Sequence, residues 1–310
     1  SETDTLAAIG TGASVDAGAG NVVVGAANST EATVAAKAKA ESGETGAGIS
    51  IGINIAGNNA TSALVDGTLS GGDDVTISAT GSHKMDTLAE GGGKAGTGGT
   101  GVGGALALTV AVNNDTEARL GAHLTGLGIG GDLSVTADHH GVASTRADGK
   151  AVGEDAAVGA AIALSFVDDA ASASVDRNVI AGGAVSVAAR GDGSSEAKAT
   201  ASAAGADTDK ESAKGSESAD DQAKSATGLA NKQSGETDLG VDQKANTDAE
   251  GDSSGAISVG AALGLNVAWS EAHARVGAVA IEAGGQFKLQ SENNMDATAL
   301  ADGSASLGKD

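Results

Sequence analysis

The chain has 310 residues with a formal net charge of −23, and it contains 50 glycines but no proline, cysteine or tyrosine. The lack of cysteine excludes structural disulfides and thiolate metal sites. The excess of acidic side chains argues against nucleic acid and anionic membranes as partners, because both bind proteins through Lys and Arg.

The first part of the sequence contains four phrases that predict strands, at 19–26, 34–40, 49–55 and 63–65. In the second phrase alanine alternates with lysine, which suits a strand with a narrow interior on one side. In the third phrase Ile alternates with Ser, Gly and Asn, a period of two residues that is typical of a strand. We expect the isoleucines to face inward and Asn58-Asn59 to form a bend before the fourth phrase.

The same phrases recur along the chain, most clearly as two glycines followed by an alternating strand. The first apolar residues of these strands are separated by 53, 58, 52 and 102 residues. They are Val22, in a weaker copy that begins with Ala-Gly, and Val75, Leu133, Val185 and Phe287. Apolar residues at i, i+2 and i+4, together with many Gly, Thr and Ser residues, favour strands over the helices that alanine would otherwise support.

Repetition at a fixed period of about 52 residues predicts units that stack, because each unit buries the apolar row of the next. We therefore predict an all-β fold, a right-handed parallel β-solenoid with a polar insertion. Gly-Gly is expected to form the corners, where positive φ and close backbone approach are needed. One ladder of the stack is expected to contain Ile53, Val110, Phe166 and Val267.

This combination of an alternating apolar strand, an Asn-rich bend, an Ala-x-Val strand and a Gly-Gly-Asp-Val strand resembles the repeats of very large bacterial exoproteins. These are the filamentous-haemagglutinin-like and autotransporter-type adhesins. The resemblance covers residues 19–203 and 255–302 and rests on short phrases. It implies a secreted or surface-displayed parallel β-solenoid, and it brings no catalytic residues.

The predicted organisation has solenoid repeats at 1–203, an acidic polar insertion at 204–254, and a continuation of the solenoid at 255–310. The insertion has 5 lysines and 12 acidic residues, with too few large apolar side chains to form a core. Three interpretations stay open at this point. The segment is a solvated loop, a binding protrusion, or a degenerate coil that fits within the 102-residue interval.

Calcium is the small ligand that the composition favours, since carboxylate oxygens are its usual ligands. The candidate metal residues are Asp207, Asp209 and Glu211. Neither a calcium-binding nonapeptide repeat nor a twelve-residue calcium loop occurs, so solvated surface charge is the competing interpretation. The adjacent His139 and His140 are expected to be a surface pair. They should point to opposite faces of a strand, which prevents them from binding one ion together.

We expect no enzymatic activity and no catalytic or cofactor-binding residues. Only three aromatic residues are present, which argues against a groove that cleaves polysaccharides. The chain has no initiator Met, no signal peptide and no apolar run of about 18 residues. It is therefore interpreted as an internal part of a longer protein without membrane insertion.

The expected role is a structural and adhesive segment, a rigid stalk or filament that presents binding loops. Its expected partners are cell-surface or extracellular-matrix ligands and neighbouring repeats of the same parent chain. The alternative is a surface-binding solenoid module that is stabilised by calcium or that binds ice or glycans.

Overall fold

The computed structural model describes residues 2–206 and 257–307, and all of the secondary-structure elements in these residues are β-strands. No helix in these ranges is long and apolar enough to cross a membrane. The strands are β1 (Thr3–Ile9), β2 (Ser14–Asp16), β3 (Val22–Ser42), β4 (Thr45–Val65), β5 (Thr68–Ser70), β6 (Val75–Ala95), β7 (Thr100–Leu120), β8 (Leu127–Ile129), β9 (Leu133–Val152), β10 (Ala156–Val175), β11 (Val179–Ala181), β12 (Val185–Ala206), β13 (Ile257–Val276), β14 (Ile281–Ala283) and β15 (Phe287–Leu307).

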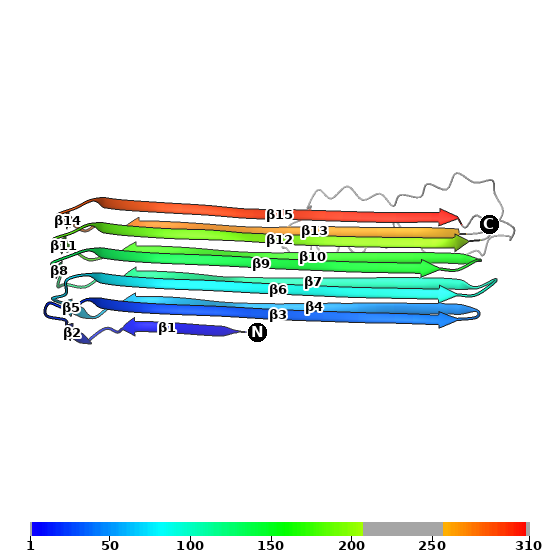
Figure 1. Cartoon of the computed structure of the whole chain (residues 1–310), viewed down its shortest axis with the longest axis horizontal. Helices are drawn as coiled ribbons and strands as arrows, with labels where there is room; N and C mark the ends of the chain where they lie inside the picture. The colour runs from blue at the N-terminus through cyan, green and yellow to red at the C-terminus, as the bar shows by residue number, and fades with distance from the viewer. Residues whose placement is uncertain (1, 207–256, 308–310) are drawn as a thin grey trace.

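The strands form a parallel β-solenoid, as the sequence predicted (Figure 1). The first long sheet has the order β1-β4-β7-β10-β13, and the second long sheet has the order β15-β12-β9-β6-β3. Short strands β8, β11 and β14 form a corner sheet at one end, with β2 and β5 paired below it. One coil therefore consists of a short corner strand, a long outgoing strand and a long returning strand.

The sequence repeat sets the register of the stack. Val75 pairs with both Val22 and Leu133, and Val185 pairs with both Leu133 and Phe287. Because β12 pairs directly with β15, and β10 with β13, no coil lies between them. The interpretation of the 102-residue interval as a degenerate coil is therefore wrong. The strand β12 also continues to Ala206, so it includes residues 204–206, the first residues of the expected insertion.

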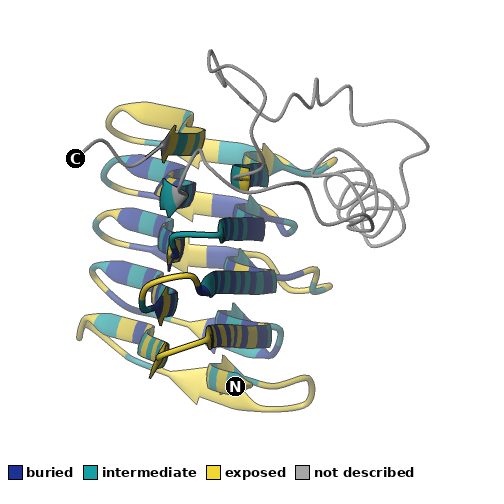
Figure 2. Cartoon of the chain, turned by 90° about the vertical axis from the view of Figure 1, so that its right-hand side faces the viewer, coloured by how far each residue is buried: buried dark blue, intermediate teal, exposed yellow. Residues whose placement is uncertain are grey.

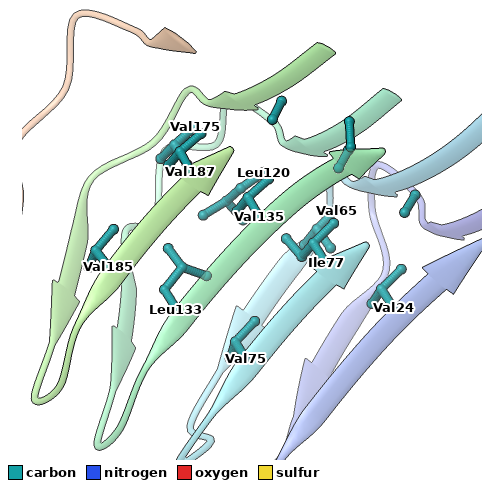
Figure 3. Packing of buried hydrophobic residues seen from close by; sticks show 14 of the residues in the cluster. Val24, Val65, Val75, Ile77, Leu120, Leu133, Val135, Val175, Val185 and Val187 are labelled. Atoms are coloured by element: carbon teal, nitrogen blue, oxygen red, sulfur yellow. The ribbon is translucent and has the colours of Figure 1, made fainter. Parts of the chain in front are cut away.

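The large apolar core lies beside the corner sheet, between the two long sheets (Figure 3). Inward Val, Leu and Ile side chains from both long sheets and the corner sheet pack there and are almost completely buried. Figure 2 shows that burial is greatest in the middle coils, while the two end coils are largely exposed. The middle coils are buried because each has a neighbour on both sides. Representative members are Val65, Val75, Leu120, Leu133, Val135 and Val185.

Away from the corner, the two long sheets come so close that only small side chains fit between them. A Cβ atom added to Gly91 of β6 would lie 1.8 Å from the carbonyl oxygen of Gly104 on β7. Ala197, Ala199 and Ala201 of β12 are fully buried in this part of the interior. The alanine alternation therefore faces a narrow interior, as the sequence predicted.

The isoleucines at 49–55 face outward, and the prediction that they face the core is wrong. Ile51 and Ile53 are 58% and 50% exposed, whereas the intervening residues of β4 point inward and Ser50 and Asn54 are buried. The reason is the narrow interior away from the corner, where an inward isoleucine of β4 would collide with the second long sheet.

The Asn58-Asn59 pair forms no bend between two strands, because β4 runs through it without a break. Asn58 instead has a positive φ of 62°, and Asn113 of β7 has a φ of 57°. At each position the inward alternation shifts by one residue, as in a β-bulge. The register of β4 and β7 is the same on both sides of these bulges, and it places Ile55 opposite Val110. The expected ladder was therefore correct in β7, β10 and β13 but two residues off in β4.

The Gly-Gly-Asp corners join successive coils through side-chain and backbone contacts. The Oδ1 atom of Asp74 accepts a hydrogen bond from the backbone N–H of Asp132 at 2.9 Å, and Asp132 accepts one from Ala184 at 2.6 Å. A Cβ atom at Gly182 would lie 2.1 Å from the carbonyl oxygen of Gly130 in the coil below. Glycine is therefore required at this corner by the close approach of two backbones.

Candidate functional site

The outer face of the first long sheet carries an uninterrupted apolar surface, which we call the apolar face. It consists of five rungs that cross β4, β7, β10 and β13, and no position in it has a polar or charged side chain. The rungs are Ala47–Val102–Val158–Val259, Ile49–Gly104–Ala160–Ala261, Ile51–Leu106–Ile162–Leu263, Ile53–Leu108–Leu164–Leu265 and Ile55–Val110–Phe166–Val267.

Exposure varies across the apolar face. The β4 row is half exposed or more, and the β7 row is half-buried. Leu164, Phe166 and Leu265 are buried and pack against one another and against their neighbours in the rungs. The most accessible part of the apolar face is therefore the row Ile49, Ile51, Ile53 and Ile55.

The outer face of the second long sheet is polar and is crossed by ion pairs between adjacent coils. Lys84 lies 2.7 Å from Glu31, and Arg190 lies within 3.4 Å of both Asp138 and Glu292. The Lys84 ammonium group lowers the pKa of Glu31 by hydrogen bonding. All of these side chains are substantially exposed, so each pair contributes little to stability. The two broad faces of the solenoid thus differ sharply in chemistry.

A ladder of polar side chains runs through the interior at the level of the bulges. Asn59 Nδ2 donates to Asn114 Oδ1 at 2.8 Å, and Asn114 Nδ2 donates to Asp169 Oδ1 at 2.8 Å. At the start of the ladder, Thr3 Oγ1 donates to Asn59 Oδ1 at 2.9 Å. The amide and carboxylate groups are buried, so these bonds fix the register of neighbouring coils.

Two buried histidines lie opposite this ladder on the second long sheet. The ring centroids of His83 and His139 are 5.2 Å apart, and His139 Nε2 lies 3.3 Å from Asp169 Oδ1. Burial and the nearby His139 together lower the pKa of His83 to about 4, while Asp169 opposes the shift. His139 and Asp169 are both almost fully buried, so this pair is closed off from solvent.

The expectation for the adjacent histidines is correct in one respect and wrong in another. His139 and His140 do point to opposite faces, and His140 is exposed and lies 3.2 Å from Asp192. His139, however, is buried rather than on the surface. It fits inside because it is opposite glycine in both neighbouring coils, Gly81 and Gly191, which leave room for an imidazole ring.

The candidate calcium residues Asp207, Asp209 and Glu211 lie outside the described residues, so calcium binding there stays a prediction. Within 2–206 and 257–307, no group of three or more His, Asp or Glu side chains is placed to hold a metal ion. Asp74 and Asp169 have structural partners in the corner and in the polar ladder.

No family model, curated protein or solved structure matches this chain. Its function must therefore be inferred from its own residues.

Sequence reasoning missed the apolar face and the buried histidine pair. Both could be found by counting residues from the aligned Gly-Gly phrases and from the Asn-Asn pairs. His83 and His139 are eight and six residues after Val75 and Leu133, which pair with each other. Positions that differ by an even number of residues lie on the same face of a sheet, so both rings share one side.

Proposed function

We propose that this chain is a structural and adhesive repeat segment of a large secreted or surface-displayed bacterial protein. The observation that carries the proposal is the in-register stacking of similar coils along one axis, with the same strand pairing from coil to coil. Such a stack is extended by adding repeats, without any change of fold. Its proposed partners are neighbouring repeats of the parent chain and cell-surface or extracellular-matrix ligands.

The dimensions of a coil favour a role in displaying surfaces over a role in spanning distance. The long strands have 20 to 22 residues, which corresponds to about 70 Å of extended chain. A whole coil nevertheless advances the stack by only one strand spacing, about 4.8 Å. A segment built in this way gains broad flat faces with each repeat and gains little length. We therefore propose adhesion through its faces and corner loops, rather than the spanning of distance, as the main role.

The alternative of an ice-binding module receives less support. Ice recognition would require regular outward rows of threonine. In the second long sheet Thr76 pairs with Ser134, and Thr136 pairs with Ser78, while Thr109 of the first long sheet is buried and bonded to Thr87 and Thr145.

Antibodies raised against the purified segment test the proposed location and role. They should label intact cells of the organism that produces the parent protein, and deletion of the segment should reduce attachment of the cells to their substratum. Labelling that appears only after the cells are made permeable would contradict the proposal. Permeabilised cells of the deletion strain give the background signal.

A further inference from the structure

The apolar face has the size of a protein–protein contact. Five rungs on four strands cover about 33 Å by about 19 Å, or roughly 600 Å². The largest apolar patch on a typical monomer is about 300–600 Å² and often has a function. A standard interface buries about 800 Å² on each partner, of which about 60% is apolar. The apolar face therefore matches the apolar part of one complete interface.

The pattern of large and small side chains on the apolar face suits packing against another flat sheet. The small side chains of Ala160 and Ala261 leave a shallow groove across β10 and β13, and exposed Ile49, whose side chain lies beside Gly104, closes the groove at β4. The rung beginning with Ile51 beside this groove is a ridge of Ile and Leu side chains. Two sheets pack face to face at about 10 Å when their side chains interdigitate. A second sheet with the same ridge and the same groove can fill both when it is related by a two-fold axis.

The charges around the apolar face favour a protein partner over a membrane. Asp115 and Glu271 lie on the outer side of the same sheet. Burial raises the pKa of nearby Asp168, and the charges of Asp115, Asp169 and Glu271 add to this effect. A lipid-binding surface usually carries Lys, Arg and several aromatic residues at its rim. Acidic groups beside the apolar face, and a net charge of −23, disfavour the approach of anionic lipids.

We propose that the apolar face docks onto the same face of a second copy of this chain, forming a two-fold symmetric pair of solenoids. The contact itself contains no charged side chain, so like charges meet only at its rim. Added salt should strengthen the pairing, because it screens the repulsion between two acidic chains. The pairing is a property of the folded chain wherever it is located, so its failure would leave the proposed structural role intact.

The test is sedimentation equilibrium of the whole 310-residue chain across the micromolar range at physiological salt. The wild-type chain should be in monomer–dimer equilibrium. Ile53→Glu, at an exposed position of the apolar face, should weaken dimerisation at least about tenfold. Ile53→Thr, which retains a β-branched side chain, should weaken it less and gives a second variant if Ile53→Glu folds poorly. Circular dichroism and the thermal midpoint verify the fold of each variant.

Val23→Glu is the matched control, because Val23 is an exposed apolar residue of β3 in the second long sheet. It should leave the dimer affinity within about twofold, as expected for a surface change away from the contact. A wild-type chain that stays monomeric would overturn the proposal, and so would a Val23→Glu variant as impaired as Ile53→Glu.

Two further experiments test for other occupants of the apolar face, and a positive result in either one overturns the proposal. In one, residues 207–256 are replaced by a short linker. If this variant dimerises and the wild-type chain stays monomeric, the apolar face would be assigned to that segment of the chain. In the other, the wild-type chain is mixed with phosphatidylcholine vesicles. Binding that Ile53→Glu abolishes, with no dimer in solution, would assign the apolar face to lipid.

Discussion

The guanidinium group of Arg177 donates a hydrogen bond from Nη2 to the backbone carbonyl of Val65 at 2.6 Å, across 112 residues of sequence. The same group donates to the carbonyls of Gly67 at 2.8 Å and Gly121 at 2.6 Å. Arg177 is only 2% exposed, and burial lowers its pKa. One planar, five-donor side chain therefore ties three coils together at the corner, which a point charge such as Lys could not do.

Replacing this side chain tests its contribution. Arg177→Met should lower the free energy of unfolding by about 2–4 kcal/mol, because it leaves buried carbonyl groups without donors. The matched control is Arg275→Met, since Arg275 is exposed and pairs with Asp176 at 2.9 Å. That change should cost less than about 1 kcal/mol. Urea denaturation measures both values, and equal losses in the two variants would contradict this role for Arg177.

The close approach of the two long sheets predicts opposite results for two neighbouring glycines. Gly91→Ala should lower the free energy of unfolding by about 2–3 kcal/mol, because its Cβ would collide with the Gly104 carbonyl of the facing sheet. Gly92→Ala should have little effect or raise stability by up to about 1 kcal/mol, because its nearest neighbours lie at 3.8 Å. Thermal unfolding of the two variants measures this difference in stability. Similar midpoints would mean that the sheets are further apart than described.

The repeat, the strand content and the parallel stacking could be predicted from the sequence, because a period of two residues and a unit of about 52 residues are both visible in it. The alternation in the phrase at 34–40, with alanine facing a narrow interior, was predicted correctly for the same reason. Which face of the 49–55 strand points inward could not be read from its alternation. That choice depends on the distance between the two sheets, which residues such as Gly91 and Gly104 set through tertiary contact.

The buried histidines were beyond the reach of local reasoning. A histidine next to a second histidine in an acidic chain is usually on the surface. His139 is inside because Gly81 and Gly191, both more than 50 residues away, lie opposite it in the neighbouring coils. Only the complete register of the second long sheet reveals this space, because it pairs His139 with glycine on both neighbouring strands.

The buried histidines also predict a pH dependence of stability. The pKa of His83 is about 4 in the folded chain, whereas an unfolded histidine has a pKa of about 6.5. Between these values the unfolded chain binds more protons, so stability falls as the pH decreases from about 6.5 to about 4. The loss should amount to about 2–3 kcal/mol.

Two variants separate His83 from the other titrating groups. His83→Gln should remove most of this dependence in urea denaturation at several pH values. His140→Gln should retain it, because His140 is exposed on the outer face. A wild-type curve and a His83→Gln curve with the same slope between pH 4 and 6.5 would show that His83 is not the group responsible.

The bulge at Asn113 should tolerate only residues that accept a positive φ. Asn113→Gly should change the free energy of unfolding by less than about 0.5 kcal/mol, while Asn113→Val should lower it by about 1–3 kcal/mol. Denaturation of both variants measures the difference. If valine were tolerated as well as glycine, the backbone at this position would not have the conformation described.

The central claim is that the bulky residues of the first long sheet face outward while its small residues line a closed interior. The chain has no cysteine, so a single introduced thiol reports its own exposure. Ile55 is 57% exposed and the next residue, Ala56, is 3% exposed. At concentrations low enough to keep the chain monomeric, a maleimide should react with Ile55→Cys about as fast as with the unfolded chain, and with Ala56→Cys only in denaturant. Rapid reaction of Ala56→Cys together with protection of Ile55→Cys would contradict the account.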